Sequence, residues 1–255
     1  KAVDTEEGGR RWIASQLTSF IPNIWQQAVR EGRVTIGDKR SDTMIGEVLK
    51  RSEVTFSYDL HDVWGNKAKT SDEWYLPRNK TGKLFVGDRA YMNWNRLNPD
   101  ARYPKYPVRP SRVYRDNKVE RRMDDKMYSE FSQIAGKLAA NAIKKTVSPE
   151  LARGGSDLAV SICDSAISRA RQVVLDQLES TGSLDINMNF QTKLLQSKLL
   201  TKGIGLLKLD PPVKLMGKSD KTFKAEKEQW QRDRDAAMEF LKTYSTINKK
   251  AKIMK

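Results

Sequence analysis

The chain of 255 residues carries 47 lysines and arginines against 32 aspartates and glutamates, a formal net charge of +15, and 38% of its residues are apolar. This length and apolar content suffice for a buried core, and the positive balance indicates an anionic partner. A single cysteine, Cys163, and a single histidine, His61, exclude a disulfide framework and a Cys/His zinc site within one chain. No run approaches 18 consecutive apolar residues, so we expect no membrane span.

The first part of the chain predicts a small unit of short helices and strands. Helices are expected on either side of Pro22 and over residues 42–51. Residues 54–58 alternate between apolar and polar side chains, which predicts a strand, and residues 84–86 predict another. We therefore expect residues 1–96 to be a mixed α/β unit.

Residues 97–117 predict an extended arm or linker. Proline recurs there at spacings that forbid a helix and favour an extended path. The prolines are Pro99, Pro104, Pro107 and Pro110.

After the arm the pattern becomes helical. Apolar residues recur at intervals of three and four between Met123 and Ala142, as expected of one buried helical face. Ser148 before Pro149 predicts the N-cap and the first-turn proline of a short helix. A third helix is expected over residues 156–180.

Two more helices are expected nearer the C-terminus. One follows Asn187 and ends before the glycines and prolines of residues 203–212. The other covers residues 220–247, and its apolar residues seven apart need a partner, either the preceding helices or another subunit. These residues are Phe223, Trp230, Ala237 and Tyr244.

The expected fold class is α+β. A small mixed unit over residues 1–96 leads into an extended basic arm, rich in proline, tyrosine and arginine, over residues 97–117. Residues 118–255 are expected to form a mainly α-helical unit with a basic C-terminal region.

The positive excess is concentrated in two blocks. Residues 78–122 hold 13 basic and 4 acidic residues, and residues 191–255 hold 16 and 7, so each block carries +9 while the rest of the chain is slightly acidic. Such concentration is typical of surfaces that follow a phosphate backbone. The alternative interpretation is that lysine-rich helix faces and termini only keep the protein in solution.

The first block interleaves six aromatic residues with arginine and lysine, which suits single-stranded or irregular nucleic acid because unstacked bases need flat faces and phosphates need cations. An alternative is an arm that packs on a neighbouring protein. The predicted nucleic-acid contacts of this block are Arg96, Arg102, Tyr103, Lys105, Tyr106, Arg109, Arg112, Tyr114, Arg115, Arg121 and Arg122.

The second block supplies lysines at spacings of four to six residues, which predicts sequence-independent attraction that weakens steeply with salt. Binding to an anionic membrane surface is an alternative, although neither block shows a matching amphipathic pattern of basic and large apolar faces. The predicted nucleic-acid contacts of this block are Lys193, Lys198, Lys202 and Lys208.

Two sequence patterns could indicate catalysis instead of binding. His61 lies between acidic neighbours, but without a second histidine or a nucleophile motif it is expected to be a histidine in a polar turn. Asp100, Asp116 and Lys118 match the spelling of the PD-(D/E)xK motif of metal-dependent nucleases, in which carboxylates hold a divalent cation. That family places the three residues on adjoining strands, whereas prolines separate them here.

These patterns lead to the hypothesis of a non-catalytic structural subunit of a nucleocapsid, virion core or ribonucleoprotein, without cofactor or metal. Its expected partners are nucleic acid, RNA or DNA, and other protein subunits of the same assembly. The alternatives are the metal-dependent nuclease and a scaffold whose basic arm binds acidic proteins. The cysteine count favours a reducing intracellular compartment or a virion interior, and the start at Lys1 indicates processing or trimming.

Overall fold

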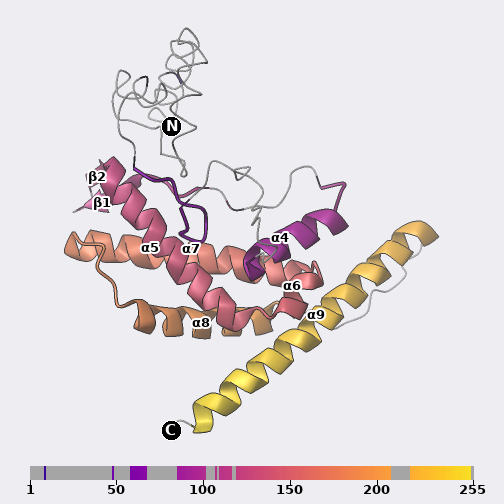
Figure 1. The fold of residues 1–255 in the computed structure, drawn as a ribbon. Coiled ribbons are helices and arrows are strands. Elements are labelled where there is room, and N and C mark those ends of the chain that lie inside the picture. Colours follow the sequence, from indigo (N-terminus) through magenta and orange to yellow (C-terminus); the bar gives the residue numbers. More distant parts are fainter. Residues whose placement is uncertain are drawn as a thin grey trace.

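The computed structural model describes residues 9, 48, 58–67, 85–101, 107, 109–116, 119–207 and 219–253. Most of this part is helical, with one two-stranded antiparallel sheet (Figure 1). A mainly helical C-terminal part is therefore confirmed. The elements are α4 (Val86–Leu97), β1 (Val113–Asp116), β2 (Val119–Arg122), α5 (Asp125–Thr146), α6 (Pro149–Arg153), α7 (Asp157–Thr181), α8 (Met188–Gly205) and α9 (Asp220–Ile253).

Side chains at the helix starts explain why these helices begin where they do. The carboxylate of Asp124 accepts a hydrogen bond from the backbone N–H of the third residue along, and Ser148, Ser156 and Asn187 do the same for α6, α7 and α8. Pro149 occupies the first turn of α6, as the sequence predicts. Gly182 ends α7 with a φ of 68°, a conformation that glycine adopts without steric cost.

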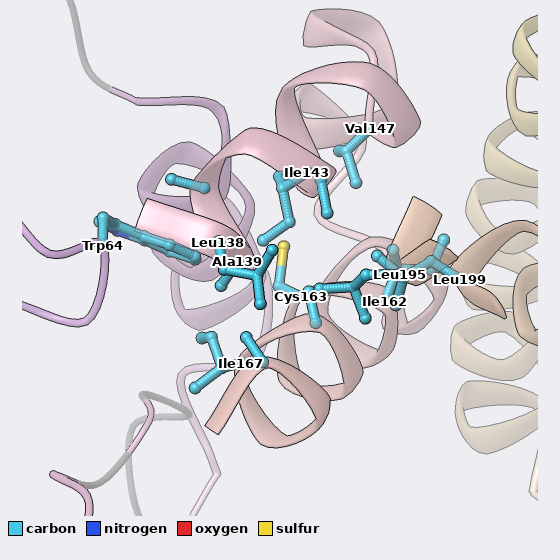
Figure 2. Close-up of a cluster of buried hydrophobic side chains, with 14 of the residues drawn as sticks. Trp64, Leu138, Ala139, Ile143, Val147, Ile162, Cys163, Ile167, Leu195 and Leu199 are labelled. Atoms are coloured by element: carbon cyan, nitrogen blue, oxygen red, sulfur yellow. The ribbon is translucent and has the colours of Figure 1, made fainter. Parts of the chain in front are cut away.

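The core lies between α5, α7 and α8. α5 crosses α7 and packs against it, and α8 packs against both helices (Figure 1). Figure 2 shows side chains from the three helices meeting around the sulfur of Cys163, which is fully buried. The labelled side chains of this cluster are Leu138, Ala139, Ile143 and Val147 around α5, Ile162, Cys163 and Ile167 from α7, Leu195 and Leu199 from α8, and Trp64.

The segment 58–67 joins the same core by a close contact with α5. Gly65 has a φ of 75°, and a Cβ added to Gly136 would fall within 2.6 Å of the Gly65 Cα. Trp64 is 2% exposed, and its ring donates a hydrogen bond to the buried Asp88 carboxylate of α4. The segment is therefore fixed by backbone contact on one side and by a tryptophan on the other.

α4 differs from the expectation for this region. Residues 84–86 were expected to form a strand, but Phe85 is the residue before the helix and Val86 begins α4. The helical spacing of Gly87, Ala90, Tyr91 and Trp94 decides the conformation, because this face packs on α6 and α7. The prediction of a strand at residues 84–86 is wrong.

The other N-terminal expectations fall mostly outside the described residues. Val48 is helical, within the expected helix over 42–51, and the strand expected over 54–58 is described only at Tyr58. The boundary between residues 96 and 97 stays a prediction. The described residues on its N-terminal side share one hydrophobic core with the helices that follow.

The last helix, α9, extends further than residues 220–247 and lies across the others, with both of its ends beyond them (Figure 1). It is anchored at its middle, where Ala236, Ala237 and Phe240 are buried. The Phe240 ring lies against Gly203 of α8, where a Cβ would come within 2.7 Å of a ring carbon. The preceding helices therefore supply the partner for this part of the apolar stripe. No helix in the described ranges has the length and hydropathy of a membrane span.

The contact between Gly136 and Gly65 is testable. Gly136→Ala is expected to lower the free energy of unfolding by about 3 kcal/mol, because the added methyl group overlaps the Gly65 backbone, which cannot move away as a flexible side chain could. Chemical denaturation followed by circular dichroism measures the change. Gly205→Ala is the control, since no atom lies within 4 Å of a Cβ there, and a similar loss in both variants would contradict the close contact.

Candidate nucleic-acid interface

A two-stranded hairpin carries the last arginines of the first basic block. Its strands are joined by two residues, because Asp116 is paired with Val119. The hairpin lies where α5 begins and α7 ends (Figure 1). Arg115 and Arg121 are exposed, one on each strand. The paired residues are Val113 with Arg122, Tyr114 with Arg121, Arg115 with Glu120 and Asp116 with Val119.

The base of this hairpin is held by Arg112, which is only 5% exposed. Its guanidinium donates to the Asp125 carboxylate at 2.8 Å and lies 4.7 Å from the centre of the Tyr128 ring. The Tyr128 hydroxyl donates to the Pro110 carbonyl, and the Met123 N–H donates to the Arg112 carbonyl. The prediction that Arg112 contacts nucleic acid is therefore corrected: it is a buried residue at the base of the hairpin.

Other predicted residues of this block lie at the surface or outside the described residues. Arg96 is exposed in the last turn of α4, and Arg109 is exposed before the hairpin. Arg122 is half-buried. Arg102, Tyr103, Lys105 and Tyr106 lie outside the described residues.

The aromatic residues of the first block are mostly engaged in packing. Phe85 lies 4.7 Å from Trp64, measured between ring centres. Tyr91 is fully buried and donates to Asp164 of α7 at 2.6 Å, and Trp94 donates to Asp157 at 2.7 Å. The Tyr114 ring packs partly against the core. These four rings hold α4 and β1 in place, and the helical spacing of the α4 aromatics is the sequence signal that could have shown this.

The second basic block forms an exposed cationic face on α8. Lys193, Lys198 and Lys202 are exposed, whereas Leu195 and Leu199 are buried against α5 and α7. None of the 18 residues of α8 is acidic. Positive charge on this face is therefore not offset within the helix. Lys208, also predicted as a contact, lies outside the described residues.

The groups considered for catalysis are scattered. Burial lowers the pKa of His61 and outweighs the nearby Asp59 and Asp62 carboxylates, so the imidazole is neutral at pH 7. Asp100 lies in a turn after α4, not on a strand next to Asp116, and Lys118 lies outside the described residues. Among the residues that the structure describes, no group of three or more His, Cys, Asp or Glu side chains could hold a metal ion.

A shallow, open groove of about 350 Å³ lies between α5 and the segment before α8. Its lining includes the carboxylates of Glu130 and Asp185 beside Ile134, Leu184 and Ile186. Two carboxylates repel an anion, so this groove does not add to the cationic surfaces.

No family model matches the chain, and no curated protein or solved structure shows a significant similarity to it. Function is therefore inferred from the charges and contacts of the chain itself. The two features that stand out are the exposed lysines of α8 and the arginine-bearing hairpin.

Arg112→Ala is expected to lower the free energy of unfolding by about 2 kcal/mol, because it leaves the Asp125 carboxylate without its buried partner and removes the contact with Tyr128. Urea denaturation measures the loss. Arg115→Ala, at an exposed position on the same hairpin, is the control and is expected to stay within about 0.5 kcal/mol of the native chain. Equal stability of the two variants would refute the structural role of Arg112.

The Cys163 thiol is expected to be unreactive in the folded protein. Burial raises its pKa well above the usual value, with the Asp164 and Asp88 carboxylates adding to the effect, so the reactive thiolate does not form. A colorimetric thiol reagent should modify Cys163 within minutes only after denaturant is added. Rapid labelling of the native protein at pH 8 would show that the α5–α7–α8 core opens readily.

Proposed function

We propose that the protein is a non-catalytic nucleic-acid-binding subunit of a larger assembly. The observation that carries this proposal is the exposed face of α8, which presents three lysines on a helix without acidic residues. Lys193 and Lys202 are separated by nine residues, about 14 Å along the helix axis, so the three lysines spread positive charge over much of the exposed side of α8.

A comparison with α9 shows why α8 is the stronger candidate. α9 also bears exposed lysines, but six acidic residues lie within its residues 220–239. Lys224 and Lys227 neighbour Glu226 and Glu228, and the Lys242 ammonium lies 3.7 Å from the Glu239 carboxylate. Opposite charges at such short range cancel the field at a distance. α8 and α9 each carry a net charge of +3, but only on α8 is none of the positive charge offset within the helix.

The hairpin provides a second, separate cationic surface. Residues 113–122 contain four basic and two acidic residues. In Figure 1 the hairpin and α8 lie on different sides of α7. A nucleic acid that contacts both surfaces has to wrap around the protein, or two segments have to bind at once, and both arrangements are typical of packaging and scaffold subunits.

Exposed apolar side chains support contacts with other subunits. Val119 and Phe190 are 60% exposed, and Met238 is 51% exposed. These residues lie on the hairpin, on α8 and on α9, so each of these three elements exposes an apolar side chain as well as charged ones. Partners in the same assembly would remove this apolar surface from water.

The α8 surface is tested by replacing its lysines. Lys193→Gln, Lys198→Gln and Lys202→Gln together are expected to weaken binding to labelled nucleic acid about 10-fold at 0.1 M salt, and to reduce the slope of log K against log salt by about 2 to 3. Fluorescence anisotropy across a salt series measures both, with single-stranded RNA, single-stranded DNA and duplex DNA as probes. Each probe is inspected afterwards for cleavage, with and without Mg²⁺.

The matched control replaces Lys224, Lys227 and Lys242 of α9 by Gln, which removes the same net charge next to acidic residues. This variant is expected to bind within about two-fold of the native chain, because its lysines are already offset. Equal losses in the two variants would show that only net charge matters. Negligible binding by the native chain at low salt would overturn the proposed function in favour of an acidic protein partner, and cleaved probes would favour the nuclease.

A further inference from the structure

We propose that the β1–β2 hairpin is a ribbon that enters the major groove of B-form duplex DNA; this rests on the proposed function and names its ligand. Each strand has four residues, about 13 Å in length, and the strands lie about 4.8 Å apart. The major groove is about 12 Å wide and admits a two-stranded ribbon, whereas the major groove of duplex RNA is too narrow.

Both faces of the ribbon carry exposed side chains, whereas Arg122 on one face and Tyr114 on the other are half-buried. Paired residues share a face, so Val113, Arg115 and Glu120 lie on one side, and Val119 and Arg121 lie on the other. All five side chains are exposed. The ribbon contacts the protein near its base, through Tyr114 and the buried Arg112, and along the β1 edge, where the Arg115 backbone N–H donates to Glu179 of α7.

The side chains of the ribbon match base edges better than they match phosphates alone. Arg115 and Arg121 can donate to the O6 and N7 atoms of guanine. Glu120 can accept from the N4 amino group of cytosine, and Val113 and Val119 can contact thymine methyl groups. A surface that only follows phosphates gains nothing from an acidic side chain or from two exposed valines. α8 has no acidic residue and is therefore a surface of the kind that only follows phosphates.

The ribbon is fixed before binding, which lowers the entropy cost of ordering it on DNA. The Arg115 backbone N–H donates to the Glu179 carboxylate of α7 at 2.9 Å, so this carboxylate is bonded to the ribbon. The Arg112–Asp125 pair at 2.8 Å holds the base of the ribbon.

The packing of the aromatic rings also favours a duplex. Stacking on unpaired bases needs rings with an open face. Tyr91 is fully buried, and Phe85, Trp94 and Tyr114 are engaged with α7, Trp64 or the core. The described part of the first block therefore offers a duplex-sized ribbon and no aromatic platform for a single strand.

The experiment compares four probes of one sequence by fluorescence anisotropy: duplex DNA, duplex RNA, single-stranded DNA and single-stranded RNA. The native chain is expected to prefer duplex DNA over duplex RNA about 10-fold, and replacement of guanine by 7-deazaguanine should weaken duplex DNA binding, because it removes the N7 acceptor of the major groove. Arg115→Gln with Arg121→Gln should abolish this preference. Arg153→Gln with Arg169→Gln, exposed positions on α6 and α7, is the charge-matched control and should keep it.

The outcomes separate this inference from the proposed function. Circular dichroism and thermal denaturation first establish that the variants are folded. If duplex DNA and duplex RNA bind equally, or if the ribbon variant keeps the preference for DNA, the ribbon assignment is overturned while α8-dependent binding can stand. If no probe binds the native chain, both proposals fail. Loss of the DNA preference in the ribbon variant alone supports the assignment.

Discussion

The close packing of α5 on α7 through small side chains is the constraint on which the rest of the structure depends. Ala139 and Ala142 of α5 and Ala166 and Ala170 of α7 are fully buried. Small side chains let two helices approach closely, and the shared face is then sealed by larger residues from the flanking elements. α8 packs against both helices, α4 packs on α7, and the hairpin is placed where α5 begins. A different α5–α7 spacing would therefore move each cationic surface.

Aromatic and carboxylate pairs attach the N-terminal part to this helix pair. Tyr91 and Trp94 each donate to a carboxylate of α7, and Trp64 donates to Asp88. A buried carboxylate that accepts a hydrogen bond costs much less than an unpaired one, and each donor ring also buries apolar surface. In each of these contacts, one aromatic side chain both buries apolar surface and donates a hydrogen bond to a carboxylate. The Trp64 ring N–H also gives the buried Asp88 carboxylate a hydrogen-bond donor.

Within the first basic block, some arginines lie at the surface and Arg112 is buried. Arg115 and Arg121 remain at the surface, whereas Arg112 is buried against Asp125 and Tyr128. Arginine, proline and tyrosine close together in sequence are compatible with an arm that binds nucleic acid and equally with the base of a hairpin. Sequence spacing cannot distinguish the two, because the partners of Arg112 lie on α5 and its burial depends on how that helix packs.

The sequence by itself determined the helices from α5 to α9, since apolar periodicity, Ser148, Pro149 and the residue before each helix are local signals. It also determined where positive charge is concentrated, because charge is a property of composition. Only the tertiary structure decided which charges face solvent and which aromatic rings are occupied. Those outcomes depend on contacts between residues far apart in the chain, such as Tyr91 with Asp164 and Gly65 with Gly136, and no local pattern records them.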